Sequence, residues 1–137
     1  MRAALRFVIK SFAEHAPQGV ALLVKRHPLD PGLVGWERLT RKLAAHYGVG
    51  DRVHYLSDWD IAQVVQTSLG VVTVNSTVGT LALNSAKPVV VLGHAVYKVP
   101  GIVHHTSLDS FWGAPRQPDM ALYSAFRRVL EDRCLIR

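Results

Sequence analysis

The sequence predicts an α/β domain, with a Rossmann-like parallel sheet of about four strands and helices on both faces. Short, continuous apolar runs, typical of strands covered on both sides, alternate with segments whose apolar residues recur at helical spacing. The resulting order after a first helix is βαβαβαβ. Because the connections are short, this order favours parallel strands joined by right-handed crossovers.

One domain accounts for the whole sequence. The 137 residues are 49% hydrophobic, enough for a single buried core, and they contain neither an internal repeat nor a low-complexity tract. We therefore expect residues 1–137 to form one Rossmann-like domain.

The first half is expected to hold two helices and two strands. Amphipathic helices are predicted at residues 3–16 and 36–47, because apolar residues line one side of each and glycines follow both. Apolar runs predict strands at residues 20–24 and 52–56, and residues 28–35 are expected to form a loop.

The second half adds two strands, at residues 71–74 and 88–92, and three helices. Ser57 or Asp58 is expected to cap a helix that buries Ile61, Val64 and Val65. Asn75 or Ser76 is expected to cap the next helix, which carries Val78, Leu81 and Ala82. Asp119 would cap the last helix, with Leu122, Phe126, Val129 and Leu130 on its inner face.

Residues 93–118 lack a periodic apolar pattern and are predicted to be a long functional loop. Tyr97 could shape a pocket for a base or a sugar, or it could simply pack on the loop. His104 and His105 suggest a metal, but adjacent histidines point in different directions and no ligand lies at the right spacing, so no metal site is expected. Asp109 is the one aspartate in this loop and a weak candidate for acid or base chemistry.

The charge favours anionic partners. Sixteen Lys and Arg residues against ten Asp and Glu residues give a net charge of +6, which suits nucleotides or acidic lipids. No stretch interleaves basic residues with aromatics, so nucleic acid is not expected. The apolar runs are far shorter than the roughly 18 residues of a membrane span. With a single cysteine and no recognisable signal peptide, we expect a cytoplasmic protein, with a possible peripheral contact to the inner membrane.

Polar residues follow two of the predicted strands, where ligands bind in open parallel sheets. Lys25, Arg26, His27 and Pro28 follow the first strand, and Lys25 and His27 should share a face because side chains alternate along extended backbone. Asn75, Ser76, Thr77 and Gly79 follow the third strand and open a helix, where free N–H groups favour a phosphate. These residues are equally ordinary helix caps, so either segment alone could be purely structural.

Other catalytic templates find no support. The sequence contains no Walker-type loop, no Gly-x-Gly-x-x-Gly after a strand and no Gly-x-Ser-x-Gly elbow. Phosphoryl transfer, hydride transfer and serine hydrolysis are therefore not expected.

Three segments, taken in order, resemble the capsule polysaccharide biosynthesis family: Lys25-Arg26-His27-Pro28-Leu29-Asp30, Val71 to Gly79 and Lys87 to Gly93. Tyr97, Pro100-Gly101 and Asp109 to Trp112 extend the resemblance over nearly the whole chain. Members are similar to bacterial transferases that move 3-deoxy-manno-octulosonic acid (Kdo) from its cytidine monophosphate (CMP) conjugate. Their architecture is GT-B-like, with two Rossmann-like halves.

The resemblance implies that this chain corresponds to the C-terminal, donor-binding half of such a glycosyltransferase. CMP-Kdo would be a substrate and no cofactor is implied. The CMP phosphate would be contacted by His27, Ser76 and Thr77. The whole donor site would consist of Lys25, His27, Pro28, Asn75, Ser76, Thr77, Gly79 and Tyr97. Lys98 stands where relatives are expected to carry an acidic or amide residue, which bears on sugar specificity.

The half that supplies the acceptor site and the catalytic carboxylate in such enzymes has no counterpart here, so we expect no sugar transfer by the chain alone. A separate polypeptide or self-association could supply it. Two other functions stay open: a nucleotide-binding or regulatory module without catalysis, and a basic domain that binds nucleic acid or anionic membranes.

Overall fold

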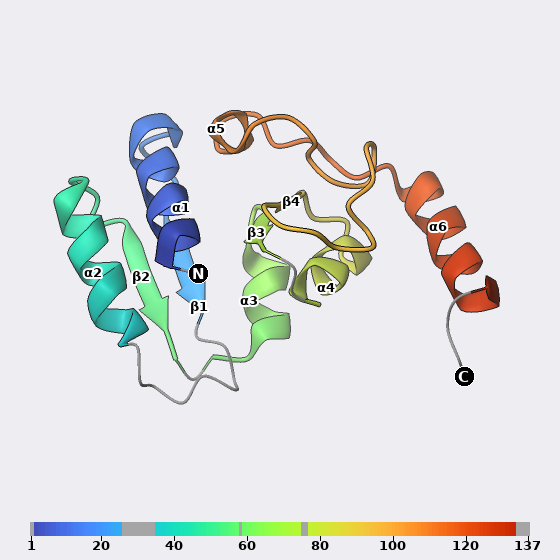
Figure 1. The fold of residues 1–137 in the computed structure, drawn as a ribbon, viewed down its shortest axis with the longest axis horizontal. Coiled ribbons are helices and arrows are strands. Elements are labelled where there is room, and N and C mark those ends of the chain that lie inside the picture. Colours follow the sequence, from blue (N-terminus) through green and yellow to red (C-terminus); the bar gives the residue numbers. More distant parts are fainter. Residues whose placement is uncertain (1, 26–34, 58, 75–76, 134–137) are drawn as a thin grey trace.

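The computed structural model describes residues 2–25, 35–57, 59–74 and 77–133. Its helices and strands follow one another in the predicted order, except that a short helix, α5, lies within the segment predicted to be a loop (Figure 1). The first half holds α1 (Arg2–His15), β1 (Leu22–Lys25), α2 (Trp36–His46) and β2 (Val53–Leu56). The second half holds α3 (Ile61–Thr67), β3 (Val71–Thr73), α4 (Val78–Asn84), β4 (Val89–Val91), α5 (Leu108–Phe111) and α6 (Met120–Arg133).

The four strands form two parallel pairs. In the first pair Leu22 of β1 lies opposite Val53 of β2, and in the second Val71 of β3 lies opposite Val89 of β4. The α/β class and the parallel pairing are thus confirmed. The described strands are hydrogen-bonded as two two-stranded sheets, so a single sheet of four strands is not confirmed.

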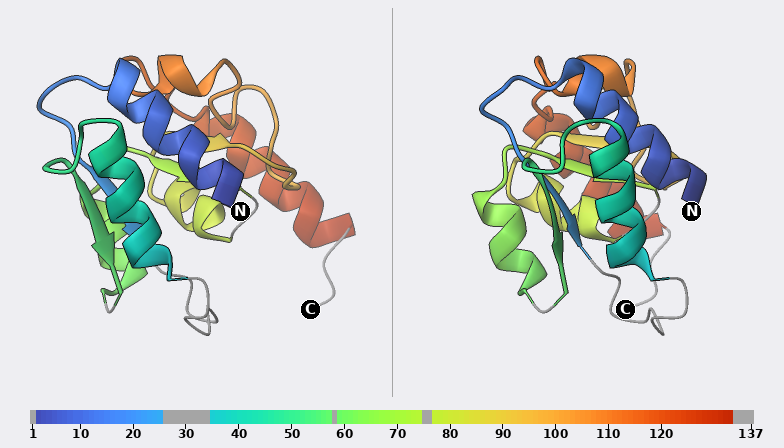
Figure 2. Two further views of the ribbon diagram at one scale, coloured as in Figure 1. Left: turned by 60° about the vertical axis from the view of Figure 1, so that its left-hand side comes forward. Right: turned by 90° about the vertical axis from the view of Figure 1, so that its left-hand side faces the viewer.

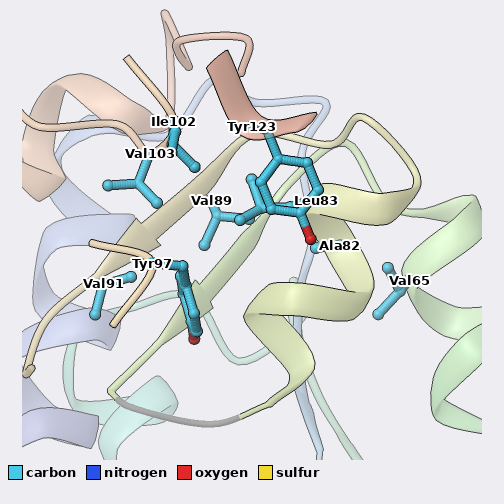
Figure 3. Close-up of a cluster of buried hydrophobic side chains, with 9 residues drawn as sticks. All are labelled: Val65, Ala82, Leu83, Val89, Val91, Tyr97, Ile102, Val103 and Tyr123. Atoms are coloured by element: carbon cyan, nitrogen blue, oxygen red, sulfur yellow. The ribbon is translucent and has the colours of Figure 1, made fainter. Parts of the chain in front are cut away.

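Helices cover both faces of the β3–β4 pair. Strand side chains alternate, so Val89 and Val91 point to one face, where they pack with residues of α4 and α6 (Figure 3). Val90 points to the other face, where it packs with α5 and with Val8 of α1. The three valines of β4 are all buried, as expected for a strand between two layers.

Helix α1 joins the two halves of the molecule. Ile9 and Phe12 are completely buried with residues of α2, β1 and β2 in a second apolar cluster. The other side of α1 faces α5, which lies beside it in both views (Figure 2). There the buried Ser11 hydroxyl donates a hydrogen bond to Asp109 Oδ1 at 2.6 Å and accepts one from Trp112 Nε1 at 2.8 Å.

Two predicted helix caps can be compared with the structure. Asp119 precedes α6 and accepts a hydrogen bond from the Leu122 N–H at 3.1 Å, which confirms that prediction. The prediction for α3 was wrong: its cap is Asp60, which accepts a hydrogen bond from the Ala62 N–H at 3.1 Å, and not Ser57 or Asp58. The helix begins after Asp60 because the next residue, Ile61, is the first apolar residue of this segment that packs against the core.

The inner face of α6 also differs from the prediction. Leu122 and Val129 are 40% and 58% exposed, whereas Tyr123 is buried and its hydroxyl donates to Asn84 Oδ1 at 2.8 Å. Phe126 packs against the apolar core as predicted. The helix is turned so that the tyrosine, which has both a ring to bury and a hydroxyl to pair, faces α4.

No helix in the described ranges has the length and apolar character needed to cross a membrane.

Candidate functional site

The predicted donor site draws on the ends of β1 and β3 and on the segment after β4. Of its eight residues, the structure describes Lys25, Thr77, Gly79 and Tyr97. His27, Pro28, Asn75 and Ser76 lie outside the described residues, so their predicted roles stay predictions.

Lys25 is the last residue of β1, at the carboxyl end of a parallel strand pair. Its side chain is half-buried, and Nζ lies 3.4 Å from the carbonyl oxygen of Ser57, just beyond the end of β2. At this length the contact is a weak hydrogen bond. The ammonium group is therefore held at the rim of the sheet with hydrogen-bonding capacity left for an anion.

Thr77 and Gly79 follow β3 on a different strand pair from Lys25. Thr77 is exposed and occupies the residue before α4, but its side chain makes no capping hydrogen bond to the helix. An open hollow of about 400 Å³ lies next to Thr77. It is lined by Ile61 of α3 and by Thr77, Val78, Thr80, Leu81 and Asn84. This hollow thus lies beside α4 and the first residue of α3.

Gly79 and Tyr97 are brought into direct contact. Gly79 is buried in the first turn of α4, and the Tyr97 ring lies against it. A Cβ atom on residue 79 would lie 2.5 Å and 2.6 Å from the ring carbons Cζ and Cε2. Because Gly79 has no side chain, the Tyr97 ring of the same protein can approach the first turn of α4 closely.

Tyr97 is a core residue that connects the segment after β4 to the end of β3. It is 6% exposed and packs with Ala82, Val91 and other members of the main apolar cluster. Burial raises the pKa of Tyr97, and a hydrogen bond with the Thr73 side chain acts in the opposite direction. Of the two interpretations, packing on the loop is the one this geometry supports, and contact with a base or sugar stays a prediction.

Several buried side chains anchor residues 93–118 to the body of the domain. Ile102, Val103, His104, Leu108 and Phe111 are all buried, and Val90 of β4 forms a bridge with His104. The sequence analysis did not identify these residues because the apolar positions form groups too short to show a period, such as Leu108 and Phe111 on the four-residue helix α5.

The buried His104 ring organises this segment. Its Nδ1 accepts a hydrogen bond from the Arg116 N–H at 3.2 Å, so the proton of the neutral ring lies on Nε2. Nε2 is 3.1 Å from the Ser107 carbonyl oxygen and 2.9 Å from the hydroxyls of Thr106 and Ser110. His105 is exposed, and among the described residues no group of three or more His, Cys, Asp or Glu side chains could hold a metal ion.

Asp109 is occupied by structural contacts. Besides the hydrogen bond from Ser11, its Oδ2 lies 3.3 Å from Nε2 of His15. Both partners come from α1, so this carboxylate joins α1 to α5.

Comparison with known proteins gives a consistent family relationship. The family model described as "Capsule polysaccharide biosynthesis protein" matches residues 1–137. The chain is 39% identical over 128 residues to the capsule polysaccharide modification protein LipB of Neisseria meningitidis serogroup A, covering 93% of this chain and 30% of the relative. It is 37% identical over 123 residues to the capsule polysaccharide export protein KpsS of Escherichia coli, covering 90% and 32%.

The chain therefore spans about a third of the length of these relatives. No solved structure matches it significantly.

Proposed function

Since this chain belongs to the capsule polysaccharide biosynthesis protein family, we propose that it is the donor-binding half of a glycosyltransferase in capsule polysaccharide synthesis. The proposed donor is a CMP-linked sugar of the Kdo type. In this proposal the chain is the C-terminal half of a GT-B architecture, and its two strand pairs are parts of one Rossmann-like sheet. The relatives named for capsule modification and export are about three times as long, which leaves room for a second half.

The placement of Lys25 is the observation that supports the proposal most. Anionic ligands of open parallel sheets bind beyond the carboxyl ends of the strands, and Lys25 provides a cation at such an end. His27, two residues further along, is proposed to join it at the CMP phosphate. Thr77 is proposed to approach the same phosphate from the end of β3, together with Asn75 and Ser76.

The proposed site would stabilise the departing nucleotide. When the bond between sugar and CMP breaks, negative charge develops on the phosphate, and groups already held in place lower the energy of that state. Lys25 would supply a fixed positive charge, and His27 would act best in its protonated form. Hydroxyl and N–H donors at the start of α4 would complete the phosphate contacts.

A nucleotide-binding module without catalysis is the second candidate, and the structural roles of three aspartates favour it. Asp60 and Asp119 cap helices, and Asp109 is bound to Ser11 and His15. In the described part of the chain these three aspartates are engaged in structural roles. Both candidates require CMP binding, and they differ in whether the longer protein transfers sugar.

Calorimetry with CMP tests the proposed site. We expect the wild-type chain to bind CMP weakly and Lys25→Ala to bind about tenfold or more weakly, because a charge-assisted hydrogen bond contributes about 1.5–3 kcal/mol. Lys87→Ala is the matched control, since Lys87 lies two residues before β4 and so near the amino end of a strand.

His27→Ala should weaken binding as Lys25→Ala does. Equal heats for the wild type, Lys25→Ala and His27→Ala would remove the proposed site.

A further inference from the structure

The outward side of α1 and α2 carries much of the positive charge of the protein. The two helices pack against each other on one side of the β1–β2 pair (Figures 1 and 2). Six exposed cationic residues lie on them, against two carboxylates, so this pair of helices holds four of the six net positive charges of the chain. We call these six residues the basic face: Arg2, Arg6, Lys10, Arg38, Arg41 and Lys42.

Phe7 lies within the basic face. Ala3, Phe7 and Lys10 are three to four residues apart on α1, so they share one side of the helix, and all three are exposed. Phe7 is 53% exposed, whereas Ile9 and Phe12 on the opposite side of α1 are completely buried. A large aromatic side chain is thus held in solvent, next to cations, on a helix that already has a buried apolar side.

The start of α2 adds a site that suits a phosphate group. Gly35, Glu37, Arg38 and Arg41 line an open hollow of about 440 Å³. Glu37 is held by Arg41 at 2.8 Å, and Arg38 adds a second guanidinium to the hollow. Guanidinium groups match the geometry of phosphate oxygens.

We propose that the basic face binds the surface of a bilayer that contains anionic phospholipids. Clusters of four to eight Lys and Arg residues on helices are attracted to anionic headgroups. Phe7 would enter the interfacial region, where aromatic side chains of peripheral proteins lie. This proposal does not depend on CMP binding, because it uses none of the donor-site residues.

A bilayer fits this face better than nucleic acid does. Single-strand binders combine a charged groove with several stacked aromatics, and Phe7 is the one exposed aromatic side chain in the described residues of α1 and α2. Duplex binding would use the cations and would gain nothing from an exposed phenyl ring. Only the bilayer makes use of both features.

Vesicle sedimentation tests the proposal. The chain is expected to bind phosphatidylcholine vesicles that contain phosphatidylglycerol, and not vesicles of phosphatidylcholine alone, with binding reduced by high salt. Each cation near an anionic surface contributes roughly fivefold in partitioning, so Arg6→Gln with Lys10→Gln should weaken binding about 25-fold. Phe7→Ser should weaken it on the order of fivefold by removing apolar area.

Matched controls change the same residue types elsewhere. Arg116→Gln with Arg128→Gln removes two exposed cations from other parts of the surface, and Val96→Ser removes a side chain that is 68% exposed. Both should bind vesicles as the wild type does. No vesicle binding, equal binding to neutral vesicles, equal losses in the controls, or binding of duplex DNA instead of vesicles would overturn the proposal.

Discussion

Replacing Phe12 by alanine is expected to lower the free energy of unfolding by about 3–5 kcal/mol. The ring is completely buried among residues of α2, β1 and β2. It also meets Trp112 edge to face with 5.2 Å between ring centroids, and the Arg52 guanidinium lies 4.8 Å from its centre. The alanine variant loses all of these contacts and leaves a cavity between α1, α2 and the β1–β2 pair.

Thermal and urea unfolding measure this effect. For a domain of this size the loss corresponds to a fall in melting temperature of roughly 10–20 °C. Phe7→Ala is the matched control, because Phe7 is on the same helix but is exposed, and its effect should stay within about 0.5 kcal/mol. Similar losses for both variants would show that α1 does not pack as described.

Replacing Gly79 by alanine is expected to destabilise the protein by about 1–3 kcal/mol and to weaken CMP binding at the same time. The added methyl group would overlap the Tyr97 ring, with contacts of 2.5 Å and 2.6 Å to its carbons. Either Tyr97 leaves the core or the start of α4 moves. Both changes disturb the segment that we propose to hold the phosphate.

Gly113→Ala is the control, since a Cβ atom at residue 113 meets nothing within 4 Å. Unfolding experiments and CMP calorimetry on the same samples separate two roles of Gly79. If Gly79→Ala kept wild-type stability and lost only CMP binding, the glycine would serve the ligand directly and not the packing of Tyr97.

The order of the four strands and of all helices except α5 could be predicted because each of these elements carries a local signal. The apolar residues of α1 recur at helical spacing, and β4 is a run of three valines. The Asp119 cap was predictable for the same reason, because a cap bonds to its own first turn. Strand pairing has no such local signal, which is why the sheet was predicted with four strands and is hydrogen-bonded as two pairs.

Features set by tertiary contacts were harder to predict. On α6, periodicity alone could not distinguish a face with Leu122 and Val129 from one with Tyr123, because both are apolar. The tyrosine is buried since α4 offers Asn84 as a partner for its hydroxyl. The sequence places Tyr97 in a segment without periodicity, so only its contact with Gly79 and its hydrogen bond with Thr73 reveal it as part of the core.

The site was predictable as far as the chemistry of strand ends allows. Lys25 was expected at the carboxyl end of a strand and is the last residue of β1. Whether the end of β1 and the end of β3 serve one ligand depends on how the two strand pairs are arranged around it, which residue types and spacing do not encode.

Nuclear magnetic resonance with added CMP tests directly whether the ends of β1 and β3 form one phosphate site. We expect the backbone amide signals of Lys25 and Thr77 to shift together, with the same midpoint in CMP concentration, while those of Gly70 and Lys87 at the opposite strand ends stay in place. Shifts at only one of the two strand ends, or shifts confined to another part of the protein, would contradict a shared phosphate site.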